Sequence, residues 1–352
     1  MGPVYGGRLL DAFGGPGAAL DATPSDWQGA GVPKRLHPQL QPPDSDGIQS
    51  DLDWLAGEHR GLLTHGDPRY PRRLREAAVP PLALFYQGDA ALLCRPQVAV
   101  VGSRSATPQG LESAAGFAAE LGRHGLLVSS GLAQGIDGAA HRGALDAGNP
   151  TVAVCGTGLD RVYPARHRAL AHRIASHGVL VSEFPTGTQP LPENFPRRNR
   201  ILSGLALGVL VVEAAPQSGS LITARLALEQ GREVFAIPGS IHSPLSRGTH
   251  ALIRQGAKLT ETVHDLLEEL MPLLGQDYKR PGGEPGSSAA AAELAPEVRR
   301  VLDALGYEAT PFDRLLERVS LPLDRLSATL LTLELEGLVT SVPGGAYLRV
   351  AG

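Results

Sequence analysis

The sequence has little cysteine and no long apolar segment. Two cysteines among 352 residues, Cys94 and Cys155, are too few for a disulfide framework, and the apolar surroundings of Cys155 predict a small core residue. No apolar run approaches the ~20 residues that cross a bilayer. The start, Met1-Gly-Pro-Val-Tyr-Gly-Gly, has neither a basic nor an apolar leader segment. These absences predict a cytoplasmic protein that neither enters a membrane nor depends on disulfides.

The usual catalytic and metal-binding motifs are also missing. The sequence contains no H-E-x-x-H, no Cys/His cluster, no G-x-S-x-G and no Gly-Lys-Ser/Thr phosphate loop. It offers no nucleophile with a partner base and no pair of carboxylates placed to divide acid and base roles. We therefore expect no catalytic residue, no metal and no cofactor, and a protein that is not an enzyme.

Charge is distributed unevenly along the chain. The net charge is −4, yet residues 95–258 carry 15 Arg and 1 Lys against 10 Asp and Glu, so the flanks are acidic. A basic middle between acidic flanks suggests contact with a polyanion. A solvated surface on an Arg-rich protein is the alternative.

The middle of the chain alternates short apolar runs with longer amphipathic segments. Strands are expected at 97–102, 126–130, 151–155, 179–183, 208–213 and 233–237. Each intervening stretch is long enough for a crossover helix, which predicts an α/β fold with a doubly wound, mostly parallel sheet. Ahead of it we expect a helix at 51–58, a strand at 62–64 and an edge strand at 82–88.

The flanks predict two smaller modules. Residues 1–48 resemble a small helical module, with a hairpin and short helix at 6–14 and a helix start at Thr23-Pro24. The Pro-rich stretch at 41–47 reads as a linker. Residues 275–292 have too little apolar surface to pack and predict a second linker. Three helices and a hairpin within 294–352 are typical of a winged helix. The main domain then spans 51–272.

The strand at 97–102 runs into a turn that suits an anion. Four apolar residues precede Gly102-Ser-Arg104, and Thr107-Pro108 predicts a capped helix start. A strand that ends in small residues before a helix leaves backbone N–H groups free for an anion, and Arg104 adds a guanidinium suited to phosphate. The stretch resembles the first strand and phosphate turn of a Rossmann-type domain, although it lacks G-x-G-x-x-G.

Other small-residue turns follow the later strands. Ser129–Asp137 contains glycines and serines that permit close approach to phosphate, or that serve only as a tight turn with Asp137 as a cap. Gly156–His167 combines a flexible turn with Arg161, Arg166 and the ring of Tyr163. Ser218–Thr223 offers hydroxyls and amides that hold phosphate or cap a helix.

The most pronounced local signal is Asn194–Arg200, with three arginines at the start of a helix. Helical spacing places Arg197 and Arg200 on one face and turns Arg198 away. Because buried charge is costly, each must be solvated, paired or facing a polyanion. Phe195 beside them either stacks on an unpaired base or anchors the loop as a core residue.

Six motifs in order carry a resemblance to a known family. They are Gly102-Ser-Arg104, Ser130-Gly-Leu-Ala-Gln-Gly-Ile-Asp137, Gly156-Thr-Gly-Leu-Asp160 with Tyr163-Pro164, Phe195-Pro-Arg-Arg-Asn-Arg200, Ser218-Gly-Ser-Leu-Ile-Thr223 and Pro238-Gly239. Their order resembles the DprA/Smf family of DNA-processing proteins over about residues 51–260. The C-terminal segment is similar to that family's winged helix, and the N-terminal segment to its sterile-alpha-motif-like module.

The resemblance implies a function and a set of contacts. Family members have an extended Rossmann-like domain, dimerise, bind and protect single-stranded DNA and load RecA recombinase in natural transformation; they are not known as enzymes. Arg104 would be a principal phosphate contact. Single-strand-binding protein is a further expected partner, and no cofactor is implied. The expected contacts with single-stranded DNA are Gly102, Ser103, Arg104, Ser130, Gly131, Gln134, Gly135, Arg161, Arg166, Phe195, Arg197, Arg198, Asn199, Arg200, Ser218, Gly219, Ser220 and Thr223.

The sequence departs from the family pattern at three positions. His167 and His250 each stand where asparagine is usual, and Gln217 stands where a basic residue is frequent. One phosphate contact is therefore in doubt at Gln217.

Three other functions remain as alternatives. A phosphoribohydrolase of the Lonely-guy type shares the fold, but Pro238-Gly-Ser-Ile-His lacks the second glycine and the glutamate of its catalytic turn. A dehydrogenase would need its ribose-binding acid after the second strand, whereas Glu213 follows the fifth. A transcription regulator would use the winged helix on duplex DNA, but acidic residues outnumber the six arginines of residues 294–350.

Limited proteolysis should separate the predicted domains. We expect the first cuts within 275–292, releasing a core near residues 51–272 that keeps most of the affinity for single strands, because the basic residues lie within it. Mass spectrometry of the fragments and fluorescence anisotropy with a labelled oligonucleotide measure both. A collapse of affinity on removing residues 290–352 would place the winged helix in the site.

Overall fold

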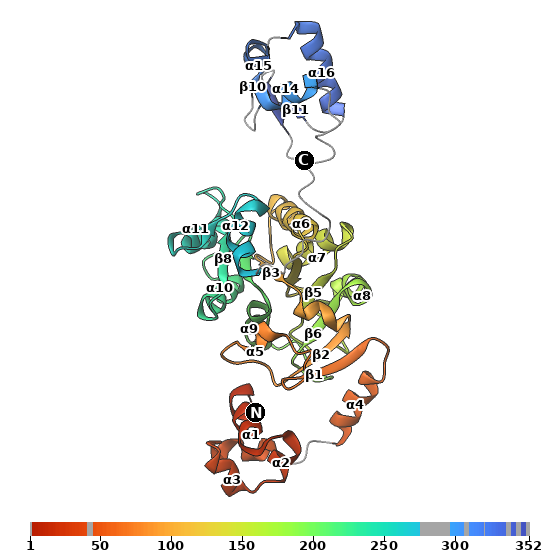
Figure 1. The fold of residues 1–352 in the computed structure, drawn as a ribbon, viewed down its shortest axis with the longest axis vertical. Helices are drawn as coiled ribbons and strands as arrows, with labels where there is room; N and C mark the ends of the chain where they lie inside the picture. Colours follow the sequence, from red (N-terminus) through yellow and green to blue (C-terminus); the bar gives the residue numbers. More distant parts are fainter. Residues whose placement is uncertain are drawn as a thin grey trace. The chain divides into compact units, whose positions relative to one another are not determined.

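The computed structural model describes residues 2–40, 45–274, 296–305, 310–319, 321–335, 339–342 and 346–349. The chain divides into two compact units, Met1–Pro281 and Gly282–Gly352 (Figure 1). The linker predicted at 275–292 lies outside the described residues. No described helix is both long and apolar enough to cross a bilayer.

The first helices surround a small core of their own. They are α1 (Pro3–Phe13), α2 (Pro16–Asp21), α3 (Pro24–Gly29) and the 3₁₀ helix η1 (Lys34–Leu40). The hairpin predicted at 6–14 is wrong, because Leu9 and Phe13 recur at helical spacing and belong to one helix whose apolar face packs near Trp27. The predicted start at Thr23 is confirmed: its Oγ accepts from Asp26 N–H, and the Asp26 carboxylate accepts from Thr23 N–H at 3.0 Å.

The next elements correct two further predictions. Helix α4 spans Ser45–Leu55, so it begins and ends earlier than the predicted helix at 51–58. It also occupies the end of the linker predicted at 41–47, of which residues 41–44 lie outside the described residues. Strand β1 (Arg60–Thr64) and the short helix α5 (Arg72–Arg75) follow.

One nine-stranded sheet organises the first unit. The other strands are β2 (Ala83–Gly88), β3 (Gln97–Val101), β4 (Leu127–Ser130), β5 (Thr151–Val154), β6 (Val179–Ser182), β7 (Gly208–Val211), β8 (Glu233–Ala236) and β9 (Lys258–Leu259). Their order is β1-β2-β6-β5-β4-β3-β7-β8-β9, antiparallel only at β1-β2 and β2-β6. All six strands predicted between 97 and 237 are confirmed. The edge position predicted for 82–88 is wrong, because β1 pairs with the outer side of β2.

Helices cover both faces of this sheet (Figure 1). Val98 and Val100 of β3 belong to one apolar core together with α6 (Pro108–Arg123), α7 (Ile136–Asp146) and α12 (Val263–Leu274). Ala99 and Val101 belong to the core on the other face, with α9 (Asn194–Leu205), α10 (Gly219–Glu229) and α11 (Arg247–Arg254). Helix α8 (Arg168–His177) packs beside α7. This alternation explains why β3 is apolar on both sides.

The strand order creates a switch point beside β3. The chain goes from β3 to β4 on one side, and β7 later pairs with the other side of β3. At such a point the connections leave the sheet in opposite directions and open a crevice at the carboxyl ends of the strands. The turns after β3 and β7 are therefore where a ligand site is expected.

The second unit has its own core and a small sheet. Its elements are α14 (Pro296–Leu305), β10 (Thr310–Pro311), α15 (Phe312–Val319), α16 (Leu323–Leu335), β11 (Val339–Val342) and β12 (Ala346–Arg349), with strand order β10-β12-β11. Leu302, Leu315 and Leu330 lie in its core. Three helices and a terminal hairpin confirm the predicted winged helix.

A buried histidine makes the stability of the first unit depend on pH. His141 of α7 contacts the Thr151 hydroxyl through Nδ1 at 2.8 Å, and that hydroxyl donates to Val128 O, so Nδ1 carries the proton. Burial lowers the pKa of His141 from 6.5 to about 3, and its neighbours His167, Arg198 and Arg142 act in the same direction. Folding therefore keeps this ring neutral.

The free energy of unfolding should fall as the pH drops below about 6.5, by at most about 1.4 kcal/mol per pH unit from this group. The reason is that the unfolded chain takes up a proton that folded His141 refuses. Urea unfolding between about pH 6.5 and 5 measures the slope. His141→Asn keeps a donor near the Nδ1 position and does not titrate, so its slope should be shallower; an identical slope would contradict the assignment.

Candidate functional site

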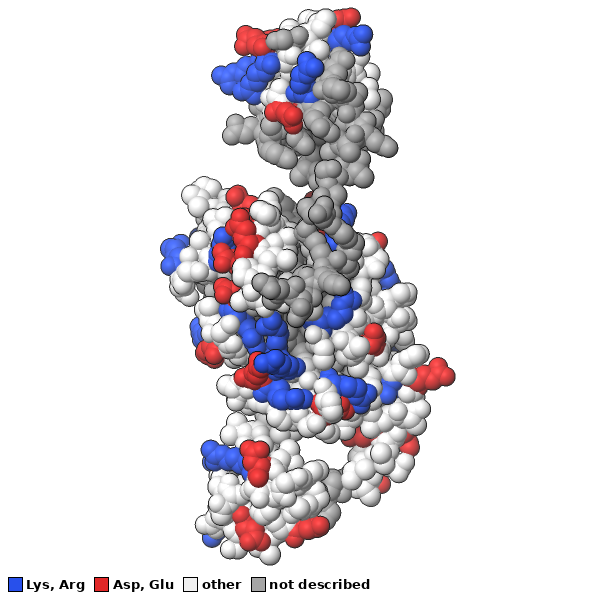
Figure 2. Space-filling view, in the orientation of Figure 1, with Lys and Arg blue, Asp and Glu red and all other residues white. Residues whose placement is uncertain are grey.

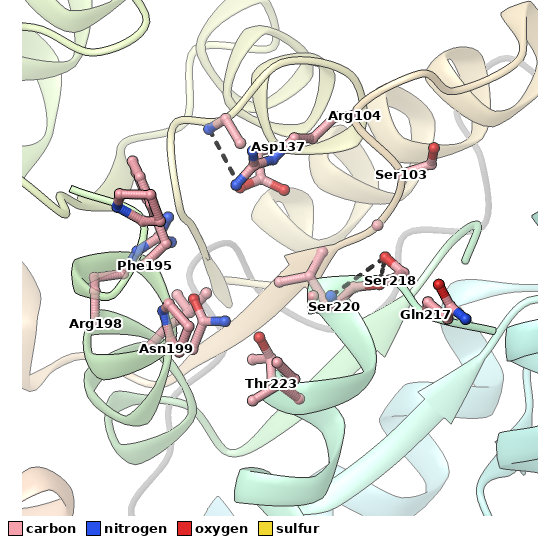
Figure 3. Close-up of a pocket in the computed structure, with 18 of the residues that line it drawn as sticks. Ser103, Arg104, Asp137, Phe195, Arg198, Asn199, Gln217, Ser218, Ser220 and Thr223 are labelled. Atoms are coloured by element: carbon pink, nitrogen blue, oxygen red, sulfur yellow. Dashed lines mark hydrogen bonds between the residues drawn. The ribbon is translucent and has the colours of Figure 1, made fainter. Parts of the chain in front are cut away.

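A cavity lies at the switch point beside β3 (Figure 3). It has a volume of about 670 Å³ and is lined by the turns after β3 and β7 and by the first turns of α9 and α10. A smaller cavity of about 100 Å³ shares Arg104, Tyr163, Phe195 and Arg198 with it. The crevice is therefore built from segments far apart in the sequence.

The turn after β3 is held in place by a carboxylate from the turn after β7. Thr107 caps α6 as predicted, and its Oγ accepts from Gly110 N–H at 3.0 Å. The Glu213 carboxylate accepts from both Thr107 N–H (2.9 Å) and the Thr107 hydroxyl (2.5 Å). Arg104 extends from this fixed turn and is exposed at the cavity. Because both Glu213 carboxylate oxygens accept hydrogen bonds from Thr107, this residue is not placed as the ribose-binding acid of a dehydrogenase.

The first turn of α10 supplies polar groups to the opposite wall. Ser218 Oγ caps the helix by accepting from Ser220 N–H at 3.3 Å, and the two hydroxyls lie 2.7 Å apart (Figure 3). Gly219 and Thr223 line the same wall. An 11-residue helix that begins at a cavity presents the positive end of its dipole there.

Arg198 is a buried cation at the base of this cavity. It is only 4% exposed, and within the described part of the chain its guanidinium has no hydrogen-bond or ion-pair partner. Gly131 makes room for it, since a Cβ there would lie 1.7 Å from Nη1 of Arg198. Burial lowers the pKa of Arg198, and the carboxylate of Asp137 opposes that shift. The nearby Asp137 carboxylate offsets part of this charge, but among the described residues it accepts no hydrogen bond from the guanidinium, which leaves those N–H groups for an anionic ligand.

Asp137 stabilises the loop beside Arg198. Its Oδ2 accepts from Gly131 N–H (3.1 Å) and Ala133 N–H (3.3 Å). Burial raises the pKa of this carboxyl, while Arg198, the two N–H groups and Arg104 oppose the rise. Because these two N–H groups already donate to Asp137, the loop does not offer them to a phosphate. The neighbouring arginines are the remaining donors for an anion.

Three side chains form a cluster at the mouth of the cavity. The Arg104 guanidinium lies over the Phe195 ring, 5.5 Å from its centroid. The rings of Tyr163 and Phe195 have centroids 5.5 Å apart and are tilted by 42°. Phe195 packs on Gly156, where a Cβ would lie 3.0 Å from the ring. Phe195 is thus covered on several sides, and Tyr163 is the more exposed ring.

The other two arginines of α9 face away from the cavity. Arg200 pairs with buried Glu183 and donates to Val79 O at 2.8 Å. Arg197 lies 3.9 Å from the same carboxylate and over the Phe184 ring. This confirms the prediction that Arg197 and Arg200 share a face from which Arg198 turns away. Burial raises the pKa of Glu183, and the two arginines oppose the rise.

The structure brings most of the expected contacts together. Those lining the larger cavity are Gly102, Ser103, Arg104, Phe195, Arg198, Asn199, Ser218, Gly219, Ser220 and Thr223. Gly131 and Gln134 line the smaller one. The remaining expected contacts line neither cavity: Ser130 is buried and donates to Val100 O, Arg161 pairs with Asp160, and Gly135, Arg166, Arg197 and Arg200 lie elsewhere.

Asp137 and Tyr163 also line the cavity, although they are outside the expected set. Asp137 lies in the first turn of α7, after β4, and Tyr163 lies in the loop after β5. This position after a parallel strand is the signal by which the sequence could have identified them. Neither motif says whether its side chain faces the crevice, because that depends on how neighbouring turns pack.

The three departures from the family pattern have separate local roles. His167 Nδ1 contacts Leu132 O at 3.0 Å, and His250 Nε2 accepts from Gly239 N–H at 3.3 Å. Both histidines therefore support turns. Gln217 is exposed and lines the cavity without adding a positive charge.

Positive charge also gathers beyond the cavity. Figure 2 shows Lys and Arg side chains over the region where Figure 1 labels α5 and α9. Arg72, Arg73 and Arg75 belong to α5, and Arg197 and Arg200 to α9. The basic surface is thus wider than the crevice.

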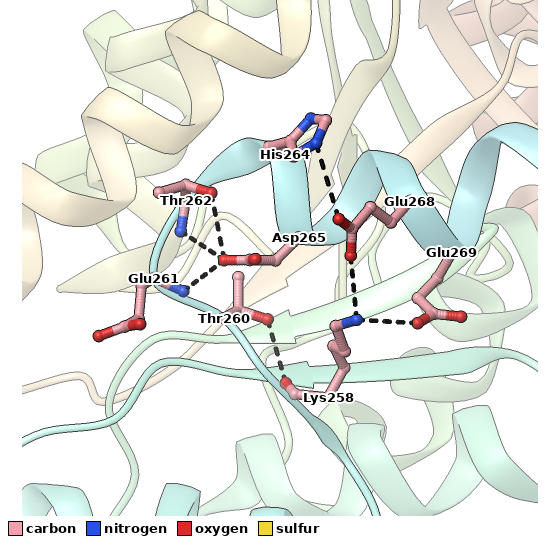
Figure 4. Close-up of polar contacts among 8 residues, drawn as sticks. All are labelled: Lys258, Thr260, Glu261, Thr262, His264, Asp265, Glu268 and Glu269. Atoms are coloured by element: carbon pink, nitrogen blue, oxygen red, sulfur yellow. Dashed lines mark hydrogen bonds and ion pairs between the residues drawn. The ribbon is translucent and has the colours of Figure 1, made fainter.

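The acidic groups at α12 are engaged within the fold (Figure 4). Asp265 accepts from Glu261 N–H (2.9 Å) and Thr262 N–H (2.8 Å). Lys258 of β9 bridges Glu268 (3.2 Å) and Glu269 (3.0 Å). Among the described residues no group of His, Cys, Asp and Glu is arranged to hold a metal.

Comparisons with known protein families and with individual proteins agree on one family. The family model of DNA recombination-mediator protein A matches residues 61–271, and that of the DprA winged helix domain matches residues 285–345. Protein Smf of Escherichia coli is 44% identical over 305 residues, which cover 86% of this chain and 81% of Smf. DNA processing protein DprA of Streptococcus pneumoniae is 49% identical over 203 residues, covering 58% and 72% of the two chains.

Two solved structures are similar. The X-ray structure of S. pneumoniae DprA has a TM-score of 0.64 at 38% identity and covers 76% of this chain and 92% of that chain. A DNA processing protein A from Helicobacter pylori, whose structure describes a single-stranded DNA binding mode, has a TM-score of 0.55 at 29% identity and covers 60% and 96%.

Glu183 should be essential for the stability of α9. Glu183→Gln removes the counter-charge of buried Arg200 and is expected to cost about 3–5 kcal/mol in the free energy of unfolding. Glu76→Gln, which breaks the exposed pair with Arg72, is the matched control and should cost less than about 0.5 kcal/mol. Urea unfolding measures both, and equal effects would show that the Glu183 pair does not anchor the helix.

Proposed function

Because this chain belongs to the DNA recombination-mediator protein A family, we propose that it binds and protects single-stranded DNA and loads RecA recombinase onto it. The proposed setting is natural transformation and recombination, with a homodimer as the working form. The proposal assigns no catalytic step to the crevice. Its residues bind and orient a strand.

The unpartnered guanidinium of Arg198 carries this proposal. The guanidinium is 4% exposed and donates no hydrogen bond among the described residues, and the Asp137 carboxylate offsets only part of its charge, so a ligand anion would satisfy its N–H groups. The first turn of α10 directs the positive end of its helix dipole at the same cavity, and Arg104 stands exposed at its mouth. A phosphodiester reaching Arg198 would gain contacts from all three.

The form of the site favours a single strand over a duplex. Tyr163 and Phe195 lie at the mouth of the cavity, next to the positive charge of Arg104. Aromatic rings beside a basic groove suit bases that are not stacked on a complementary strand. The H. pylori relative, described by its single-stranded DNA binding mode, supports the same choice.

Loading of RecA is the finer part of the proposal, and the family's description as a recombination mediator supports it. A strand-exchange assay tests it: the protein should shorten the lag of RecA on strands coated with single-strand-binding protein. No change in the lag would limit the function to strand binding. Light scattering tests the dimer.

Arg104→Ala should weaken binding to single strands of any sequence without loss of folding. Each lost phosphate contact releases one counterion fewer, so the slope of log K against log salt should flatten by about 0.7. Arg104→Lys should restore only part of the affinity, because an ammonium cannot form the bidentate contact. Fluorescence anisotropy with labelled single-stranded and duplex oligonucleotides at several salt concentrations measures all three.

The matched control is Arg123→Ala, which removes an exposed arginine at the last residue of α6, outside both cavities. It should leave affinity and slope unchanged. If folded Arg104→Ala binds like the wild type with the same slope, the turn after β3 is only a scaffold. If the wild type prefers duplex to single strands, the proposed function is wrong.

A further inference from the structure

Tyr163 is an exposed aromatic residue at the mouth of the cavity. Its side chain is 46% exposed and lines both cavities. Within the described part of the chain its hydroxyl has no hydrogen-bond partner, and its ring contact is with Phe195. An exposed aromatic ring beside a basic cavity is placed where a base of a single strand can stack.

Phe195 is less suited to contact a base directly. Its ring lies against Gly156, beneath the Arg104 guanidinium and beside Tyr163. A base could reach the Arg104 side only by displacing that guanidinium. Phe195 therefore supports its two neighbours: it fixes where the Tyr163 ring stands and where the Arg104 charge is held.

On the basis of the proposed function, we infer that Tyr163 is the residue on which a base of the bound single strand stacks, with Phe195 as its positioning residue. Phosphates are then bound by Arg104 and Arg198, and the base by Tyr163. These two parts of the site recognise different portions of one nucleotide unit. Tyr163 consequently distinguishes a strand that carries bases from a bare sugar–phosphate chain, which the arginines do not.

The test compares oligothymidylate with an abasic oligonucleotide of the same length and charge. Tyr163→Ala should weaken binding to oligothymidylate by about 5- to 150-fold, the range of one base–aromatic stack. It should leave binding to the abasic strand and the salt slope unchanged. Tyr163→Phe keeps the ring and should bind like the wild type. Leu228→Ala, at a similarly exposed residue of α10 outside both cavities, is the control.

Tyr163→Trp gives a direct readout that does not depend on a loss of affinity. The chain has only two tryptophans, Trp27 and Trp54, and both are buried, so a new exposed indole supplies a distinct signal. Stacking should quench its fluorescence with oligothymidylate and not with the abasic strand. Equal quenching by both strands, or by neither, would overturn the inference.

The outcomes separate this inference from the proposed function. If the wild type binds neither strand, the proposed function itself fails. If the wild type binds oligothymidylate and Arg104→Ala weakens it, while Tyr163→Ala changes nothing, the function stands and the stacking inference is wrong. If Tyr163→Ala weakens both strands equally, the tyrosine only shapes the cavity and the inference is again wrong.

Discussion

The candidate site depends on the cost of burying arginine on α9. The buried charge of Arg200 is stabilised within the protein by an ion pair with Glu183 and a hydrogen bond to Val79 O. These contacts fix the helix against the sheet. Arg198, two residues earlier, points to the other side, and in the described part of the chain no carboxylate or carbonyl accepts a hydrogen bond from it. Helix α9 thus carries Arg200, which anchors the helix, and Arg198, which we propose binds the ligand. The first holds the second in place, so that a phosphate meets a charge that is already oriented.

The strand order brings the remaining groups to that charge. Because β3 lies between β4 and β7, the turns after β3 and β7 open away from each other and leave space between them. Glu213 links the two turns through Thr107, which keeps the walls at a fixed separation. Helix α10, which begins after Ser218, directs the positive end of its dipole at the cavity. The sheet, the polar link and the helix ends therefore act on one crevice.

Local signals in the sequence predicted much of this fold. Buried parallel strands are apolar on both faces, so β3 to β8 stand out, and Thr107-Pro108 and Thr23-Pro24 are explicit helix starts. The order of strands is a non-local property, which is why β2 was expected at an edge that β1 occupies. Side-chain direction was predictable within α9 from helical spacing. It was not predictable between turns, so Arg161 and Arg166 were expected in a crevice that Tyr163 and Asp137 line instead.

A crystal structure of the protein with oligothymidylate tests the central claim most directly. We predict a phosphate of the strand within hydrogen-bonding distance, about 3 Å, of the Arg198 guanidinium, between the first turn of α10 and Arg104. That result would show that the buried charge on α9 is completed by the ligand. A strand bound along another surface, with no anion at Arg198, would contradict the account.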